Sequence, residues 1–257
     1  MALTDQQQKL KQSLIDTGEE WNSSFENILK LDPKYFEAYV GLRRVPREKK
    51  ALPVKIQELV LLAMDAACTH LYEPGIKIHT AAALKAGATK EEIMETLELS
   101  SVLGVHAVTV GVPTLLEVLK ENGRELPQEL NSDQESLKDE FTKRRGYWST
   151  SWDPVIRLSP EFFEGYLNFS IVPFSEGHNA LDAKTKELMY TAIDVSTTHL
   201  FRTGLKIHIR NAINYGATEH EIMEVFELAA LMGITTTMKG ADALVEGLAT
   251  LEGKGDY

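Results

Sequence analysis

The histidines that could do chemistry stand in two nearly identical phrases of this chain, THLYEPGIKIH at 69–79 and THLFRTGLKIH at 198–208. Each phrase has a histidine near both ends. An unperturbed histidine titrates near pH 6.5, so it can take up or release a proton at neutral pH. A glutamate lies upstream of each phrase, and a nearby carboxylate can fix the tautomer of an imidazole. The expected catalytic residues are His79, His208, Glu58, Glu187, His70 and His199.

A second carboxylate follows each of these glutamates. Asp65 is seven residues after Glu58, and Asp194 is seven residues after Glu187, so each pair shares one helix face two turns apart. Two interpretations remain open: a narrow stripe facing solvent, or a carboxylate at the edge of a pocket. In a pocket, partial burial would raise the carboxylate pKa and suit the group to proton transfer.

The phrases repeat because a long segment repeats. Residues 58–99 match residues 187–228 at an offset of 129, with about half of the positions identical. Upstream of this block the offset is 127, as when Trp21 meets Trp148. A period of this length is far longer than that of a solenoid repeat and indicates two copies of one domain. We expect a first domain over 10–122, a polar linker over 123–136 and a second domain over 137–250.

Helical signals position the candidate residues in both copies. Thr89 with Glu92, and Thr218 with Glu221, read as capping boxes after a glycine turn. Apolar residues recur at helical spacing, and no run alternates as a half-buried strand would. The sequence therefore predicts an all-α fold made of two tandem helical domains.

Composition narrows the class of protein. The chain has 257 residues and a formal net charge of −11, which disfavours nucleic acid because binding to phosphates depends on basic side chains. No apolar run approaches the length of a membrane span, and the N-terminus lacks the apolar core of a signal peptide. A single cysteine, Cys68, agrees with a reducing compartment. We expect a cytoplasmic protein that binds neither nucleic acid nor membrane.

The block around the later histidines resembles the carboxymuconolactone decarboxylase family, which includes the alkylhydroperoxidase D-like proteins. In the first copy the resembling residues are Glu58-Leu59, His79, Ala83, Gly87-Ala88-Thr89 and Glu92-Ile93. In the second copy they are Glu187-Leu188, His208, Ala212, Gly216-Ala217-Thr218 and Glu221-Ile222. The resemblance implies that fold, and it implies a homotrimer shaped as a pseudo-hexameric ring for a tandem member.

The thiol motif of the peroxidase branch is missing. Its C-x-x-C positions fall on Tyr72 and Gly75 in one copy, and on Phe201 and Gly204 in the other. Thiol turnover usually needs an attacking and a resolving cysteine. Peroxiredoxin-type alkylhydroperoxidase activity is therefore disfavoured.

The decarboxylase branch needs no thiol. The resemblance implies a lyase that uses His/Glu acid–base chemistry on a small lactone or carboxylic acid, of the kind formed in aromatic-compound degradation. Positioned acid–base groups typically contribute about 10²- to 10⁴-fold. The expected substrate-binding residues are Tyr72, Phe201 and His106; Thr235 stands at the position matching His106.

Two other classes stay open. One is a metal-dependent enzyme in which the same glutamates and histidines bind zinc, iron or manganese. Neither copy has the H-x-x-x-H spacing that places two ligands on one helix, so we expect no metal and no cofactor. The other is a non-enzymatic binding protein that kept only the ring-forming fold.

Overall fold

The structure is a computed structural model that describes residues 2–126 and 129–252. Every regular element in these ranges is helical, which confirms the predicted all-α fold of two tandem repeats. The elements of the first repeat are α1 (Asp5–Ile15), α2 (Ser23–Leu31), α3 (Pro33–Lys49), α4 (Val54–Ala66), α5 (Glu73–Lys85), α6 (Lys90–Ser101), the 3₁₀ turn η1 (Val102–Val105) and α7 (His106–Glu121).

The second repeat runs in the same order. Its elements are α8 (Ser132–Arg145), η2 (Thr150–Trp152), α9 (Asp153–Leu158), α10 (Pro160–Ser170), η3 (Val172–Phe174), α11 (Ala183–Val195), α12 (Arg202–Asn214), α13 (Glu219–Ala230), η4 (Leu231–Gly233) and α14 (Ile234–Glu252). The stretch 132–136 of the expected linker is helical, because Asn131 caps α8. Residues 127–128 of that linker lie outside the described residues.

The capping boxes start the helices where the sequence predicts. Thr89 Oγ1 accepts a hydrogen bond from the backbone N–H of Glu92, and Glu92 Oε2 accepts one from the backbone N–H of Thr89. Thr218 and Glu221 do the same at the start of α13. These reciprocal bonds satisfy N–H groups that have no partner inside the helix.

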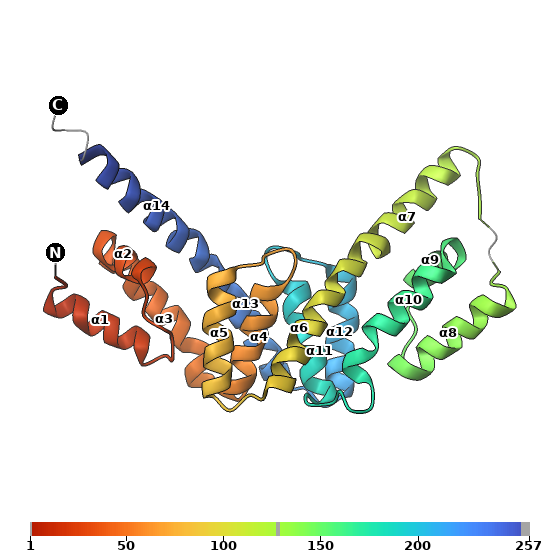
Figure 1. The fold of residues 1–257 in the computed structure, drawn as a ribbon, viewed down its shortest axis with the longest axis horizontal. Helices are drawn as coiled ribbons and strands as arrows, with labels where there is room; N and C mark the ends of the chain where they lie inside the picture. The colour runs from red at the N-terminus through yellow and green to blue at the C-terminus, as the bar shows by residue number, and fades with distance from the viewer. Residues whose placement is uncertain (1, 127–128, 253–257) are drawn as a thin grey trace.

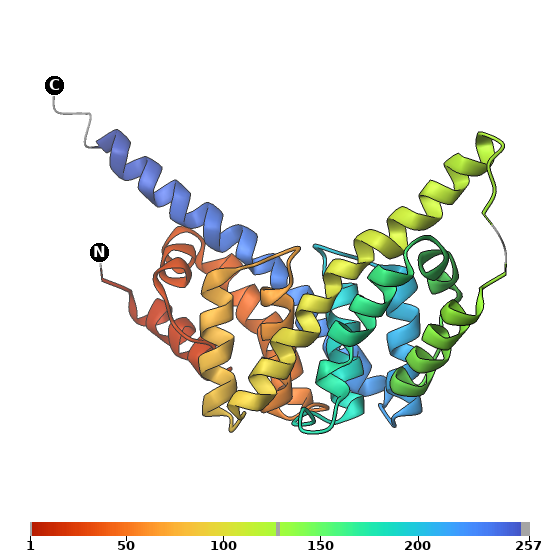
Figure 2. The same ribbon diagram turned by 45° about the vertical axis from the view of Figure 1, so that its right-hand side comes forward.

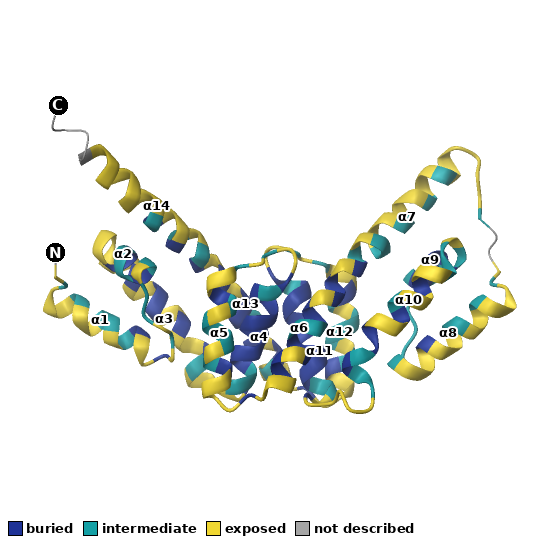
Figure 3. Ribbon diagram, viewed as in Figure 1, coloured by how far each residue is buried: buried dark blue, intermediate teal, exposed yellow. Residues whose placement is uncertain are grey.

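The core forms where the two repeats meet. Figures 1 and 3 show α4 and α11 near the centre of the molecule, where the ribbon is mostly dark blue. Leu59, Leu62 and Met64 of α4 are fully buried, and α4 contacts α11, α5 and α6. Because α4 and α11 carry the candidate glutamates, two largely buried helices of the core position them.

The last helix of each repeat packs on the other repeat. Helix α14 contacts α2, and Ser24 and Asn27 of α2 each donate a hydrogen bond to the carboxylate of Asp242. Helix α7 contacts α9 and η2 of the second repeat. Figures 1 and 2 show α7 rising beside the green helices and α14 rising beside the red ones. Each half of the molecule therefore contains parts of both repeats.

A buried carboxylate on α13 joins the second repeat to the first. Glu224 is fully buried and accepts hydrogen bonds from the backbone N–H groups of Ala51 and Leu52, at 2.8 and 3.0 Å. It also accepts one from Gln57 Nε2 at 2.8 Å. These bonds compensate for the removal of the carboxylate from water.

Glu95 on α6 occupies the matching place. It accepts hydrogen bonds from the backbone N–H groups of Ala180 and Leu181, and Lys186 Nζ lies 3.4 Å from Glu95 Oε2. The repeats differ here in one respect, since a buried lysine replaces the neutral Gln57.

The continuous helical stretch Lys90–Glu121, built from α6, η1 and α7, is long and apolar enough by composition to cross a membrane. Several of its residues have a role inside the fold. Thr96, Leu99 and Ser100 of α6 are buried in the core, and Val105 of η1 is buried where α7 begins. No residue of α7 is buried, and its side chains Val110, Leu115 and Val118 are exposed.

Candidate functional site

Each later histidine is hydrogen-bonded to the glutamate of its own repeat. His79 Nδ1, on α5, lies 2.8 Å from Glu58 Oε2, on α4. His208 Nδ1, on α12, lies 2.7 Å from Glu187 Oε2, on α11. A carboxylate accepts, so Nδ1 carries the hydrogen and Nε2 is left free to exchange a proton.

The free nitrogen of each of these imidazoles faces the aspartate two turns further along the glutamate helix. His79 Nε2 lies 3.6 Å from Asp65 Oδ2, and His208 Nε2 lies 3.9 Å from Asp194 Oδ2. Both aspartates are buried, so of the two interpretations left open by the sequence the pocket edge holds and the solvent stripe does not. Burial raises the pKa of Asp65 to about 6 and that of Asp194 to about 7.

Glycine is required where the histidine helices approach these aspartates. A Cβ on Gly75 would lie 1.9 Å from Asp65 Oδ2, and one on Gly204 would lie 2.3 Å from Asp194 Oδ2. The chain reverses just before, at Leu71 and Leu200, which have positive φ angles of 44° and 52°. The absence of a side chain at each glycine lets the first turn of the helix lie against the carboxylate.

The first-repeat site is filled by charged side chains. Arg47 forms an ion pair with Glu58, and Arg43 Nη2 lies 3.9 Å from Glu58 Oε1. Arg43 also donates a hydrogen bond to Glu19 at 2.7 Å. Burial lowers the pKa of His79, which therefore stays neutral. The cavity left beside His79 is about 50 Å³, enough for water and too small for an organic substrate.

The second-repeat site is open because those arginines are absent. At the offset of 127 residues, Ser170 stands in place of Arg43 and Phe174 in place of Arg47. A cavity of about 350 Å³ results, and volumes of this order take small organic ligands. Its polar lining includes His106, Arg145, Tyr147, Ser149, Ser151, Tyr190, Asp194, Thr203 and His208.

One cation lines this cavity without a salt bridge, and the Glu187 carboxylate acts on it only from a longer distance. The guanidinium of Arg145 lies 3.9 Å from the centre of the Phe174 ring, and its Nη1 donates only a long hydrogen bond of 3.5 Å to the Ser170 carbonyl. No carboxylate of the described residues forms an ion pair with it. Arginine stays charged at any physiological pH, so this cavity presents a positive charge to whatever enters.

A tyrosine connects this cation to the histidine. The ring of Tyr190 stacks on His208 with centroids 4.6 Å apart, and the guanidinium of Arg145 lies 5.8 Å from the Tyr190 ring centre. At the matching place in the first repeat the chain has Leu61. Arg145 and His208 therefore face the same cavity from positions that one small molecule can span.

His70 and His199 lie beside the aspartates, and among the described residues neither forms a hydrogen bond or ion pair with a glutamate. His70 Nε2 lies 3.5 Å from Asp65 Oδ1, and His199 Nε2 lies 3.9 Å from Asp194 Oδ1. Burial lowers the pKa of both histidines. Each of these histidines therefore lies next to the aspartate and is not hydrogen-bonded to the histidine–glutamate pair of its site.

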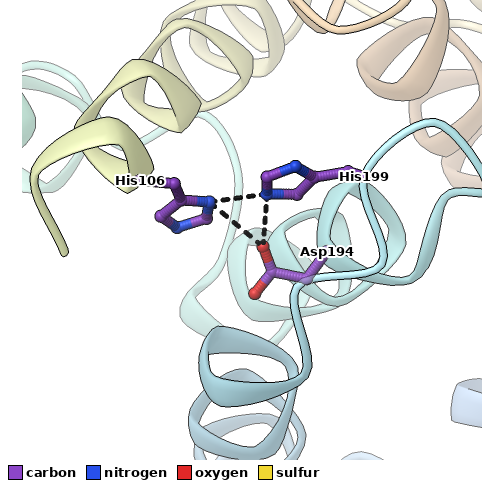
Figure 4. A group of neighbouring side chains, drawn as sticks. All are labelled: His106, Asp194 and His199. Atoms are coloured by element: carbon purple, nitrogen blue, oxygen red, sulfur yellow. Dashed lines mark hydrogen bonds and ion pairs between the residues drawn. The ribbon is translucent and has the colours of Figure 1, made fainter. Parts of the chain in front are cut away.

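His106 reaches the second-repeat site from the first repeat. Its Nδ1 lies 2.7 Å from His199 Nε2 and 3.8 Å from Asp194 Oδ1, as Figure 4 shows. Burial lowers the pKa of His106 to about 3, with His199 and His208 adding to the effect. Thr235 lines the first-repeat site in the corresponding position. The histidine–histidine contact therefore exists in one site only.

The expected aromatic residues lie beside these histidines. The Tyr72 ring centre is 5.6 Å from that of His70, and the Phe201 ring centre is 4.0 Å from that of His106. Phe201 lines the larger cavity and Tyr72 the smaller one. Arg145 and Tyr190 were not anticipated. Their only signal in the sequence is that the repeats differ there, with Gly18 and Leu61 at the matching positions.

The comparisons with known proteins identify the family. The model of the carboxymuconolactone decarboxylase family matches residues 33–120 and 160–246, one match in each repeat. A crystal structure from Burkholderia xenovorans LB400, described as that of a candidate gamma-carboxymuconolactone decarboxylase subunit, is 41% identical with a TM-score of 0.91. The alignment covers 95% of this chain and 98% of that one. No curated protein matches the chain. The chain belongs to the carboxymuconolactone decarboxylase family.

Proposed function

We propose that the second-repeat cavity is the active site of a lyase that decarboxylates a small carboxylated lactone or related carboxylic acid. The observation that carries this proposal is the His208–Glu187 pair opening into a cavity that also holds the unpaired cation Arg145. The charge favours an anionic substrate, and the pair supplies a proton donor next to it.

Arg145 is proposed to hold the substrate through its anionic oxygen atoms. A guanidinium offers two parallel N–H groups to a carboxylate, which fixes orientation as well as position. Tyr147, Ser149 and Ser151 add hydroxyl groups to the same cavity. Leu103, Trp152 and Ile193 line other parts of its wall and are apolar. An apolar surrounding favours loss of a carboxylate as neutral CO₂, because it stabilises the charged group poorly.

In the proposed reaction the bond between the substrate carbon and its carboxylate breaks, and CO₂ leaves. The electron pair moves into the conjugated lactone carbonyl and forms an enolate. His208, in its protonated form, then delivers a proton from Nε2 to carbon and is recharged from solvent. Glu187 orients the ring through Nδ1 and stabilises the transient imidazolium. The same groups would serve lactone isomerisation.

The first-repeat pair is proposed to be catalytically silent. Glu58 is engaged by Arg47 and Arg43, and the cavity beside His79 has no room for a substrate. This distinction between two chemically similar pairs supplies a matched control for the active-site variant.

The test is turnover of gamma-carboxymuconolactone and a panel of small carboxylated lactones, followed as CO₂ release. We expect His208→Gln to lower turnover by about 10² or more, and His79→Gln to stay within a few-fold of the wild type. Circular dichroism would verify that both variants keep their helix content. Equal losses in the two variants, or no CO₂ from any substrate, would contradict the proposal.

Thiol peroxidase activity is the second candidate, and the position of Cys68 argues against it. This thiol is exposed, and it lines neither cavity. Cys68→Ser should leave the native turnover intact. Loss of turnover with an unchanged fold would revive the thiol mechanism.

We further propose that the protein works as a cytoplasmic homotrimer. Helices α7 and α14 extend from the centre as two arms that are largely yellow in Figure 3. Their exposed apolar residues include Val110, Leu115, Val118, Leu244, Leu248 and Leu251. Exposed apolar residues gathered on two helices are typical of surfaces that pack against another copy.

A further inference from the structure

Three neighbouring side chains at the second-repeat site have no role in the proposed proton transfer, and two of them, His106 and Asp194, line its cavity. His106 of α7, Asp194 of α11 and His199, just before α12, bring their potential ligand atoms within 4.8 Å of one another. We propose that these three residues bind one divalent transition-metal ion of the zinc type. The ligands would be His106 Nδ1, His199 Nε2 and an oxygen of Asp194, the three atoms that dashed lines join in Figure 4.

The distances are close to those that such an ion needs. Zn–N bonds of 2.0–2.1 Å separate two ligand atoms of a tetrahedral ion by about 3.3 Å. The nitrogens of His106 and His199 are 2.7 Å apart, and Asp194 Oδ1 lies 3.8 and 3.9 Å from them. The two rings are coplanar, with centroids 4.9 Å apart and the two nitrogens facing each other, so the rings would have to move apart and turn toward Asp194 to bind an ion. The metal would replace the hydrogen bond that joins the two imidazoles.

An independent observation concerns Asp194. Its side chain is 3% exposed, and its Oδ2 has no hydrogen-bond partner among the described residues. That oxygen faces His208 Nε2 at 3.9 Å, whereas Oδ1 faces His106 and His199. A cation bound at Oδ1 would offset part of the cost of burying the carboxylate.

The donor set favours a borderline metal. Two imidazoles and one carboxylate suit zinc, cobalt or nickel better than magnesium or calcium, which prefer oxygen ligands. Three protein ligands leave a fourth position open toward the cavity, as in catalytic zinc sites. An ion there could polarise an oxygen atom of the substrate, so this inference goes beyond the proposed acid–base pair.

The first repeat provides an internal comparison. Asp65 and His70 stand there as Asp194 and His199 do, and Thr235 stands in place of His106. Two of the three ligands are therefore present in the first repeat, and the third is missing. One ion per chain is expected from this difference.

The experiment uses the full-length protein without a histidine tag, freed of metal by a chelator and titrated with Co²⁺. We expect one Co²⁺ per chain, with the visible absorption bands of an ion bound by imidazole and carboxylate. His106→Thr copies the residue of the other repeat and should weaken binding by at least about 100-fold, the upper range for loss of a mere supporting contact. His70→Thr is the matched control and should retain one Co²⁺ per chain. Thr235→His should raise the number to two.

The readout is ion binding by the resting protein, so the inference stands or falls independently of the proposed reaction. No Co²⁺ uptake by the wild type at millimolar concentration would overturn it, as would undiminished binding by His106→Thr. Circular dichroism would show whether that variant is folded. If it is not, His199→Gln removes a different ligand and decides the matter in the same titration.

Discussion

His106 Nδ1 lies 2.7 Å from His199 Nε2, although 93 positions separate the two residues and they belong to different repeats. The contact exists because α7 leaves the first repeat and packs on the second. Helix α14 makes the reverse crossing, and it brings Thr235 to the site of the first repeat. Because α7 and α14 each cross to the other repeat, each site contains residues from both repeats. A substitution in either repeat can therefore make the two sites different.

Glu224 and Glu95, the buried carboxylates that each bind the other repeat, should differ in their contribution to stability. Glu224→Gln weakens charge-assisted hydrogen bonds to the backbone N–H groups of residues 51 and 52, and should cost about 1.5–3 kcal/mol. Glu95→Gln weakens the equivalent bonds and also removes the carboxylate that balances the buried charge of Lys186, whose remaining contacts, the Pro173 carbonyl and Asn179, are neutral. It should cost more, about 3–5 kcal/mol.

Urea unfolding at one fixed protein concentration measures both effects, because assembly makes stability depend on concentration. The double variant Glu95→Gln/Lys186→Gln copies the neutral Gln57 of the first repeat and should recover part of the loss. Equal destabilisation by the two single variants would show that the lysine contributes nothing.

Asp65 should make the protein less stable as pH rises. Burial raises its pKa in the folded state to about 6, from an ordinary value of 3.8. Between these values the folded state binds more protons than the unfolded state, so stability falls as pH increases through this window. Below this window Asp65 is protonated in both states, and its burial carries no ionisation cost. Above the window the folded state bears the full cost of the ionised carboxylate, on the order of 2–3 kcal/mol.

Asp65→Asn removes this titration while keeping the side-chain size. The measurement is the free energy of unfolding of the variant minus that of the wild type. We expect this difference to be about 2–3 kcal/mol more favourable to the variant at pH 8 than at pH 4. His70, His79 and Glu19 also surround this carboxyl, and the comparison at two pH values subtracts their common effects. A variant difference that does not change with pH would contradict the raised pKa.

Much of the fold could be predicted because its signals are local. A capping box or a helical period depends on residues within a few positions, and the Thr89–Glu92 and Thr218–Glu221 boxes form as expected. The repeat itself is visible in the alignment of the chain with its own second half. The crossing of α7 and α14 leaves no such trace, because either repeat could have covered its own site with the same apolar residues.

The candidate sites were harder to predict for a related reason. The sequence shows that Arg43 becomes Ser170 and Arg47 becomes Phe174, but it does not show that these side chains point at the glutamate. Only the folded structure shows that Arg43 and Arg47 of α3 reach Glu58 of α4, where they fill the first-repeat site. In the same way, the spacing of Glu187 and Asp194 places both on one helix face without deciding whether that face meets solvent or the core.

The proposed assembly predicts a specific mass and a specific way to break it. Sedimentation should give about three times the 28.7 kDa chain mass. Leu244→Glu with Leu248→Glu places two charges on one exposed apolar stripe of α14 and should dissociate the trimer, because burying an unpaired charge is costly. Glu246→Gln, about 200° round the helix from Leu244, is the control and should remain trimeric. A wild-type monomer at micromolar concentration would contradict the assembly.

Arg145 should determine the affinity for the substrate rather than the proton-transfer step. Its guanidinium faces the cavity without a salt bridge, so a bound carboxylate would gain a charge-assisted contact of about 1.5–3 kcal/mol. Arg145→Gln should therefore raise KM by roughly 10- to 100-fold, with a smaller change in kcat. Arg145→Lys keeps the charge and loses the bidentate hydrogen bonding, so its KM should lie between that of the wild type and that of Arg145→Gln.

The neighbouring Arg144 pairs with Glu140 outside the cavity, and Arg144→Gln should leave KM unchanged. Steady-state kinetics on the best carboxylated lactone, together with an uncharged ester of the same compound, separates charge recognition from general damage. The ester should bind wild type and Arg145→Gln about equally well, since neither protein can form an ion pair with it. If Arg145→Gln raises KM for acid and ester alike, the arginine shapes the cavity and does not recognise the anion.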